Sequence, residues 1–167
     1  MRLLGAGFLW ISLTCLGVAY ARKLKNRTAL LENTKHLINR IKIETEFLHL
    51  PVQEILFKLT KASQLKSIDF IAEVCCLTEK GEDFPRAWKL AVEGTDLNYK
   101  IEEKEKLLQL GQSFGTSDIK NQIMMLEAYE SYFDEFISKA KNIYLKQAGS
   151  AGLLGCLVGC MLFILLI

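Results

Sequence analysis

The sequence predicts an all-α protein, in which a cytosolic antiparallel bundle of about six helices is flanked by two terminal transmembrane helices. Apolar residues in the middle of the chain recur at intervals of three and four, which is the spacing of one helix face, and no stretch alternates as a strand does. Both ends of the chain are uncharged and apolar over about twenty residues, the length at which a helix crosses the hydrocarbon core of a bilayer.

Residues 148–167 form the C-terminal run, which holds no charged side chain. A water-soluble domain rarely ends in a helix that is apolar all round, and only a helix satisfies its own backbone groups in lipid. Three lysines precede the run and no charge follows it: Lys139, Lys141 and Lys146. Because basic residues stay on the cytosolic side, the run is predicted to leave the cytosol toward its C-terminal end.

Small residues recur at every fourth position of this run, at Ala151, Gly155 and Gly159. Such spacing lets two membrane helices approach closely, so these residues are predicted to pack against the first span or against another copy of the chain. Glycine is also simply common in membrane helices, and the sequence does not decide between the two interpretations.

The second uncharged run lies near the N-terminus, with Arg2 before it and a basic cluster at residues 22–27 after it. The basic cluster favours an uncleaved helix whose N-terminus lies outside the cytosol. Ala19 and Ala21 also fit the cleavage site of a signal peptide. A secreted helical domain that is anchored only by its C-terminal tail is therefore the alternative.

The two charge patterns agree, and they predict three parts: a transmembrane helix at residues 1–21, a cytosolic bundle at 22–147 and a transmembrane helix at 148–167. The middle part is long enough to bury a core of its own. Its acids and bases are interspersed, without a basic block beyond the membrane edge. Nucleic acid is therefore not a predicted partner.

The first helix of the bundle is predicted over residues 22–49, and neither glycine nor proline separates it from the N-terminal span. The sequence thus allows the two to be one continuous helix. Pro51 fits the first turn of the second helix. Ser67 is the predicted cap of the third helix, and Gly81 is its predicted end.

Pro85 fits the first turn of a short fourth helix, which Gly94 is predicted to stop. Asp96 or Asn98 is the predicted start of a fifth helix, which Gly115 closes. The glutamates of that helix, Glu102, Glu103 and Glu105, alternate with lysines. This pattern predicts a solvated helix face, with a docking patch as the alternative.

The last helix is predicted to begin at Ile119, and no helix breaker follows before Gly149, so it runs on into the C-terminal span. Its apolar face is wide and is interrupted by Glu130. A face of that width is expected to pack between two neighbouring helices.

The turn before this helix is predicted to depend on three residues. Gly115 can adopt a positive φ at the end of the preceding helix. Ser117 or Asp118 can accept hydrogen bonds from the first backbone N–H groups of the last helix.

No catalytic, metal-binding or cofactor-binding motif occurs in the sequence. The five cysteines form no C-x-x-C pair, and His36 and His49 have no acid at ligand spacing. Nucleotide-binding loops and hydrolase motifs are absent as well. The chain is therefore not predicted to be an enzyme, and no cofactor or metal is predicted. A membrane-tethered enzyme with catalytic residues scattered along the chain is the alternative.

Three stretches of the sequence are distinctive: residues 50–52 (LPV), residues 84–88 (FPRAW) and, most specifically, the G-x-x-x-G-x-S-D-x-x-x-Q pattern at 111–122. With these stretches the chain resembles the stage III sporulation protein AB family of endospore-forming bacteria. The resemblance covers essentially the whole chain. It marks seven candidate structural or partner-contact residues: Pro85, Trp88, Gly111, Gly115, Ser117, Asp118 and Gln122. For Trp88, burial in the core is preferred over a partner contact.

The resemblance implies a function that the residues alone do not. The family is similar to the inner-membrane platform proteins of type II secretion and type IV pilus machines. The chain would then be a non-enzymatic assembly subunit of a secretion-like channel between mother cell and forespore, in the mother-cell membrane that surrounds the forespore. Its expected partners are a cytosolic secretion-type ATPase, the other membrane subunits of the channel and a second copy of itself.

Overall fold

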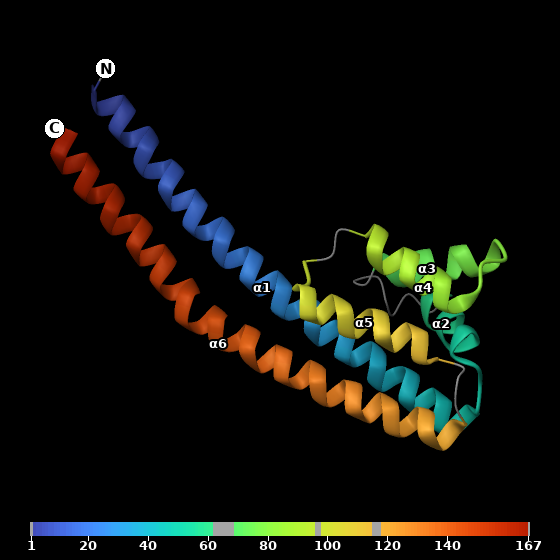
Figure 1. Ribbon diagram of the computed structural model, residues 1–167. Helices are drawn as coiled ribbons and strands as arrows, with labels where there is room; N and C mark the ends of the chain where they lie inside the picture. The colour runs from blue at the N-terminus through green and yellow to red at the C-terminus, as the bar shows by residue number, and fades with distance from the viewer. Residues whose placement is uncertain (1, 62–68, 96–97, 115–117, 167) are drawn as a thin grey trace. The chain divides into compact units, whose positions relative to one another are not determined.

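The computed structural model describes the backbone of residues 2–61, 69–95, 98–114 and 118–166. These ranges contain six helices and no strand, which confirms the all-α prediction. The helices are α1 (Arg2–Leu48), α2 (Val52–Lys61), α3 (Asp69–Glu79), α4 (Phe84–Gly94), α5 (Ile101–Ser113) and α6 (Ile119–Leu166), as Figure 1 shows.

The chain divides into two compact units, and the long helices α1 and α6 contribute to both. Residues 30–136 form one unit, which we call the bundle. Residues 1–29 and 137–167 form the other, which we call the terminal unit. The prediction that each terminal run continues into its neighbouring helix without a break is confirmed, because α1 and α6 each extend from one unit into the other.

All six helices contribute to the core of the bundle. Its largest fully buried side chains are Leu31, Leu37, Ile38, Ile41, Ile55, Leu56, Phe70, Ile71, Trp88, Leu107 and Phe133. The apolar spacing of the first helix places Leu31, Ile38 and Ile41 in this core, whereas Leu48 at the end of α1 is exposed. Helices α2, α3, α4 and α5 pack against one another in chain order.

Most predicted helix ends agree with the structure. The carbonyl of Pro51 accepts the first hydrogen bonds of α2, Pro85 lies in the first turn of α4, and α4 ends at Gly94. Gly81 follows α3 with a φ of +94°, which a residue with a Cβ rarely adopts. Ser67, the predicted cap of α3, lies outside the described residues.

The predicted start of the fifth helix at Asn98 is wrong, since α5 begins at Ile101. Glu103 supplies the reason: its Oε2 accepts the backbone N–H of Lys100 at 2.7 Å, so the helix is capped from within its first turn. Glu103 is therefore buried, which corrects the prediction of a solvated face at this position; Glu102 and Glu105 are exposed as predicted. Asp96, the other predicted start, lies outside the described residues.

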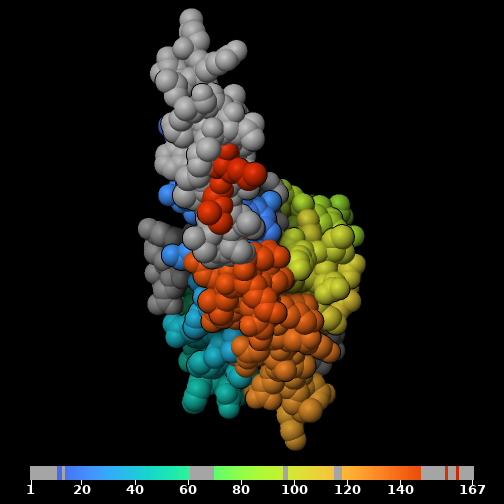
Figure 2. All heavy atoms as spheres, turned by 90° about the vertical axis from the view of Figure 1, so that its left-hand side faces the viewer, coloured from blue at the N-terminus to red at the C-terminus, as the bar shows by residue number. Residues whose placement is uncertain are grey.

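Within the bundle, α6 packs between two neighbours, as the width of its apolar face predicted. Lys42 of α1 forms an ion pair with Glu130, and the ammonium group of Lys106 on α5 lies 4.5 Å from the ring centre of Tyr132. Figure 2 shows α6 in orange, with the end of α1 in cyan on one side and α5 in yellow on the other.

In the terminal unit, the Tyr20 hydroxyl of α1 donates a hydrogen bond of 2.9 Å to Gln147 Oε1 of α6. Several apolar side chains of this unit are exposed: Ile11, Leu16, Val18, Leu157 and Met161. Among the residues that the structure describes, no helix is both long enough and apolar enough to span a membrane. The side chains of residues 1–10 and most of those of 148–167 lie outside that description, including Ala151, Gly155 and Gly159.

Candidate functional site

Trp88 of α4 lies directly on the backbone of α5. Its side chain is completely buried, and its Nε1–H donates a hydrogen bond of 2.8 Å to the carbonyl oxygen of Leu107. Leu107 and Gly111 are one helical turn apart. The pyrrole edge of the indole, which carries Nε1, therefore lies on a single turn of α5, where it is hydrogen-bonded to Leu107 and lies against Gly111.

Gly111 is the residue that permits this close approach. A Cβ at position 111 would lie 2.0 Å from Cδ1 and 2.5 Å from Nε1 of Trp88, which is far inside van der Waals contact. Glycine in a helix interior costs about 1 kcal/mol relative to alanine. Here that cost is offset by the packing of the largest side chain of the core.

Three phenylalanines surround the same indole ring. Ring centres lie 5.4 Å away for Phe70, 5.5 Å for Phe114 and 6.0 Å for Phe84, mostly in edge-to-face geometry. Such pairs stabilise a core by about 0.5–1.5 kcal/mol each beyond the area they bury. The cluster joins α3, α4 and the end of α5 into one packed group.

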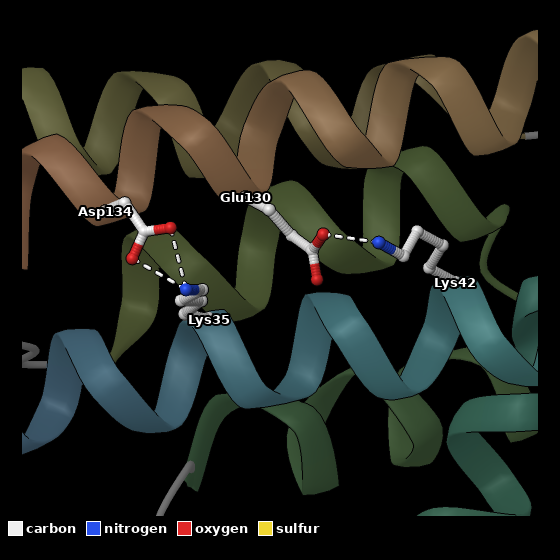
Figure 3. A network of polar contacts seen from close by, with 4 residues as sticks. All are labelled: Lys35, Lys42, Glu130 and Asp134. Atoms are coloured by element: carbon white, nitrogen blue, oxygen red, sulfur yellow. Dashed lines mark hydrogen bonds and ion pairs between the residues drawn. The ribbon is translucent and has the colours of Figure 1, made fainter.

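Two ion pairs join α1 to α6 within the bundle, as Figure 3 shows. Lys35 Nζ donates to both carboxylate oxygens of Asp134, at 2.6 and 2.7 Å. Lys42 Nζ donates to Glu130 Oε2 at 2.6 Å. Because the residue number rises along α1 while it falls along α6, the two helices run antiparallel here, which fits the antiparallel bundle expected from the sequence.

The two pairs differ in exposure. The side chains of Lys42 and Glu130 are 19 % and 14 % exposed, against 33 % and 58 % for Lys35 and Asp134. The hydrogen bond with Glu130 raises the pKa of Lys42, and this effect outweighs the lowering by partial burial. The ion pair with Lys42 explains why a charged residue, Glu130, is tolerated within the apolar face of α6. The second carboxylate oxygen of Glu130, Oε1, is buried and has no hydrogen-bond partner among the described residues.

A buried hydroxyl pair connects α1 with the residues before α5. Thr34 Oγ1 donates to the carbonyl oxygen of Leu30 at 2.9 Å and also contacts the Tyr99 hydroxyl, so Tyr99 is the donor in that second bond. Burial raises the pKa of Tyr99, which keeps the phenol neutral and able to donate.

Of the predicted site residues that the structure describes, Trp88 and Gly111 are brought together. Pro85 is partly exposed in the first turn of α4. Asp118 is exposed, and its carbonyl accepts the N–H of Gln122, whose side chain is buried. Gly115 and Ser117 lie outside the described residues. Whether any of the seven residues contacts a partner stays a prediction.

Sequence reasoning missed Lys42 and Tyr99, which both contact another part of the bundle, and it placed the capping residue Glu103 on a solvated face. A charged residue inside an apolar stripe was the one available signal, and it pointed to Glu130 without identifying its partner. In the described residues, no group of three or more His, Cys, Asp or Glu side chains is placed to hold a metal ion. The geometry of the site is thus one of helix–helix contacts.

No curated protein and no solved structure is significantly similar to the chain. A family model described as stage III sporulation protein AB matches residues 2–167, which is nearly the entire sequence. The chain therefore belongs to the stage III sporulation protein AB family.

Proposed function

We propose that this stage III sporulation protein is a non-enzymatic assembly subunit of a secretion-like channel between mother cell and forespore. It is anchored in the mother-cell membrane by spans at residues 1–21 and 148–167, with the bundle in the cytosol. There it couples a cytosolic secretion-type ATPase to the other membrane subunits. This role follows from the resemblance of the sequence, which implies a relationship to the platform proteins of type II secretion machines.

The observation that carries the anchoring is the position of the apolar side chains. The bundle buries large apolar side chains from all six helices, and the apolar side chains that it exposes, such as Phe47 and Ile101, lie on stretches that also carry many charged residues. In the terminal unit, Ile11, Leu16, Leu157 and Met161 are between 56 % and 69 % exposed on helices from both ends of the chain. Exposed apolar side chains on the uncharged terminal stretches of these two helices match a lipid environment, where hydrocarbon takes the place of a protein core.

The topology is tested in non-sporulating cells that express the chain in the cell membrane, by labelling single cysteines with a membrane-impermeant maleimide, with the native cysteines replaced by serine. A cysteine at Lys141 is expected to react only after permeabilisation, because it lies on the cytosolic side. A cysteine added after Ile167 is the matched control and is expected to react in intact cells. Labelling of position 141 in intact cells would instead support the secreted, tail-anchored alternative.

The coupling role is tested by purifying the tagged full-length chain in mild detergent from cells arrested after engulfment. The cognate sporulation ATPase is expected to co-purify. If it is absent while other membrane subunits of the complex remain bound, the chain does not couple the ATPase to the channel.

A further inference from the structure

A cavity of about 580 Å³ opens on the bundle between α2 and α3. Its floor is apolar and is formed by Leu56 and Phe57 of α2, Val74 of α3 and Phe84 at the start of α4. Phe57 is 38 % exposed, so part of a large aromatic side chain faces solvent at the cavity. A cavity of this size, with an apolar floor and few polar groups, is typical of a binding site.

The rim of the cavity carries uncompensated negative charge. Glu54 of α2 and Glu79 of α3 are exposed at the rim, and neither has an ion-pair or hydrogen-bond partner among the described residues. Lys58 also lines the cavity, but it donates to Glu44 of α1 at 3.2 Å, so its charge is already balanced. An occupant with a positive charge beside an apolar surface is therefore complementary to this site.

We propose that this cavity binds an amphipathic helix of a partner protein. The apolar face of that helix contacts Phe57 and Leu50, and a lysine or arginine beside it lies against Glu54 and Glu79. Helices bind in grooves through apolar anchors at three- and four-residue spacing, and the rim carboxylates select a basic neighbour for those anchors. The inference rests on the proposed function, because an assembly subunit acts through contacts of this kind.

Two cysteines offer a direct report on occupancy. Cys75 lines the cavity, whereas Cys76, the next residue of α3, does not. A bound helix is expected to slow the alkylation of Cys75 and to leave that of Cys76 unchanged. Burial raises the pKa of the Cys75 thiol, so the reaction is best followed at pH 8 to 9, where more thiolate is present.

The test uses the full-length chain in nanodiscs and overlapping synthetic peptides that cover the cytosolic segments of the other sporulation-complex subunits. Peptides that bind are expected to combine helical apolar anchors with at least one lysine or arginine. Phe57→Asp is expected to weaken their binding by more than about tenfold, since it places a charge in the apolar floor. The double variant Glu54→Gln/Glu79→Gln is expected to weaken it by about threefold to tenfold.

Glu73→Gln is the matched control, because Glu73 is an exposed glutamate of α3 that does not line the cavity. It is expected to leave peptide affinity unchanged, and all variants should melt close to the parent chain.

Four results would overturn the proposal. They are the absence of any binding peptide, affinity unchanged in Phe57→Asp, binding peptides without a basic residue, and competition by lipid alone. Self-association that Phe57→Asp abolishes would likewise overturn it, by assigning the cavity to a second copy. An ATPase that still co-purifies with Phe57→Asp leaves the proposed function standing whatever the peptides show, so the two failures are distinguishable.

Discussion

Two interfaces of the bundle are held together by opposite means. At the contact of α4 with α5, Trp88 fills the space above Gly111 completely and is surrounded by phenylalanine rings. At the contact of α1 with α6, ion pairs of unequal exposure join the helices. The first interface depends on shape, so one added methyl group disrupts it. The second depends on charge, so the effect of a substitution follows how far water reaches the pair.

The largest effect is expected from Gly111→Ala. The new Cβ would overlap the indole ring at 2.0 Å, and the ring has no free space because it is fully buried. Overpacking of this kind costs about 3 kcal/mol or more in the free energy of unfolding, which exceeds the gain of about 1 kcal/mol in helix propensity. Denaturant unfolding of the full-length chain measures the difference.

Gly94→Ala is the control for that experiment. A Cβ at Gly94 meets nothing within 4 Å, and its φ is not in the left-handed region. Alanine there is expected to leave stability unchanged or to raise it by up to about 1 kcal/mol. Equal effects of the two glycine substitutions would show that the shape of the Trp88 contact is not what stabilises the α4–α5 interface.

The next effect is expected from Trp88→Phe, which removes both ring volume and the hydrogen bond to the Leu107 carbonyl. A loss of about 2–3 kcal/mol follows from the cavity and the lost bond. The smaller ring also leaves room for a methyl group at position 111. Trp88→Phe combined with Gly111→Ala is therefore expected to cost less than the sum of the two changes, and strict additivity would contradict the contact.

The two ion pairs are expected to differ by their exposure. Glu130→Gln leaves the largely covered Lys42 without its anionic partner and should cost about 1–3 kcal/mol. Asp134→Asn affects the more exposed pair and should cost at most about 1 kcal/mol. Urea midpoints of the two variants compare them directly. A larger loss from Asp134→Asn would mean that exposure does not rank these pairs.

The sequence predicted the helices better than the contacts between them. Apolar spacing gave the buried stripe of α1, and the width of the apolar face of α6 predicted its two neighbours. The start of α5 was missed because the prediction looked for an asparagine or aspartate just before the helix, where caps usually lie. Instead, Glu103 caps α5 from within its first turn. A cap of this kind is visible only once the side chain is placed.

The site was less predictable because its contacts join residues far apart in the chain. Trp88 and Gly111 were both marked by the family resemblance, yet nothing in the local pattern of either one indicates that they touch. Glu130 was visible as a charge in an apolar stripe, but many lysines were available to pair with it and only the packing of α1 on α6 selects Lys42. Spacing predicts faces, whereas partners follow from tertiary packing.

The smallest effect expected at the α1–α6 interface depends on pH. The hydrogen bond from Lys42 to Glu130 raises the pKa of Lys42 above its ordinary value of 10.5 in the folded chain. The unfolded chain therefore releases this proton first, so the stabilisation is complete below pH 10.5 and is lost as the pH rises through the folded pKa.

The measurement compares the parent chain with the variant Lys42→Met. Burial raises the pKa of Tyr99 too, so Tyr99 also changes stability in this alkaline range, but it is present in both chains. The difference in unfolding free energy between these two chains cancels that contribution and should shrink between pH 9 and pH 12. A difference that stays constant over this range would show that the charge of Lys42 does not stabilise the interface, leaving only the packing of its aliphatic stem.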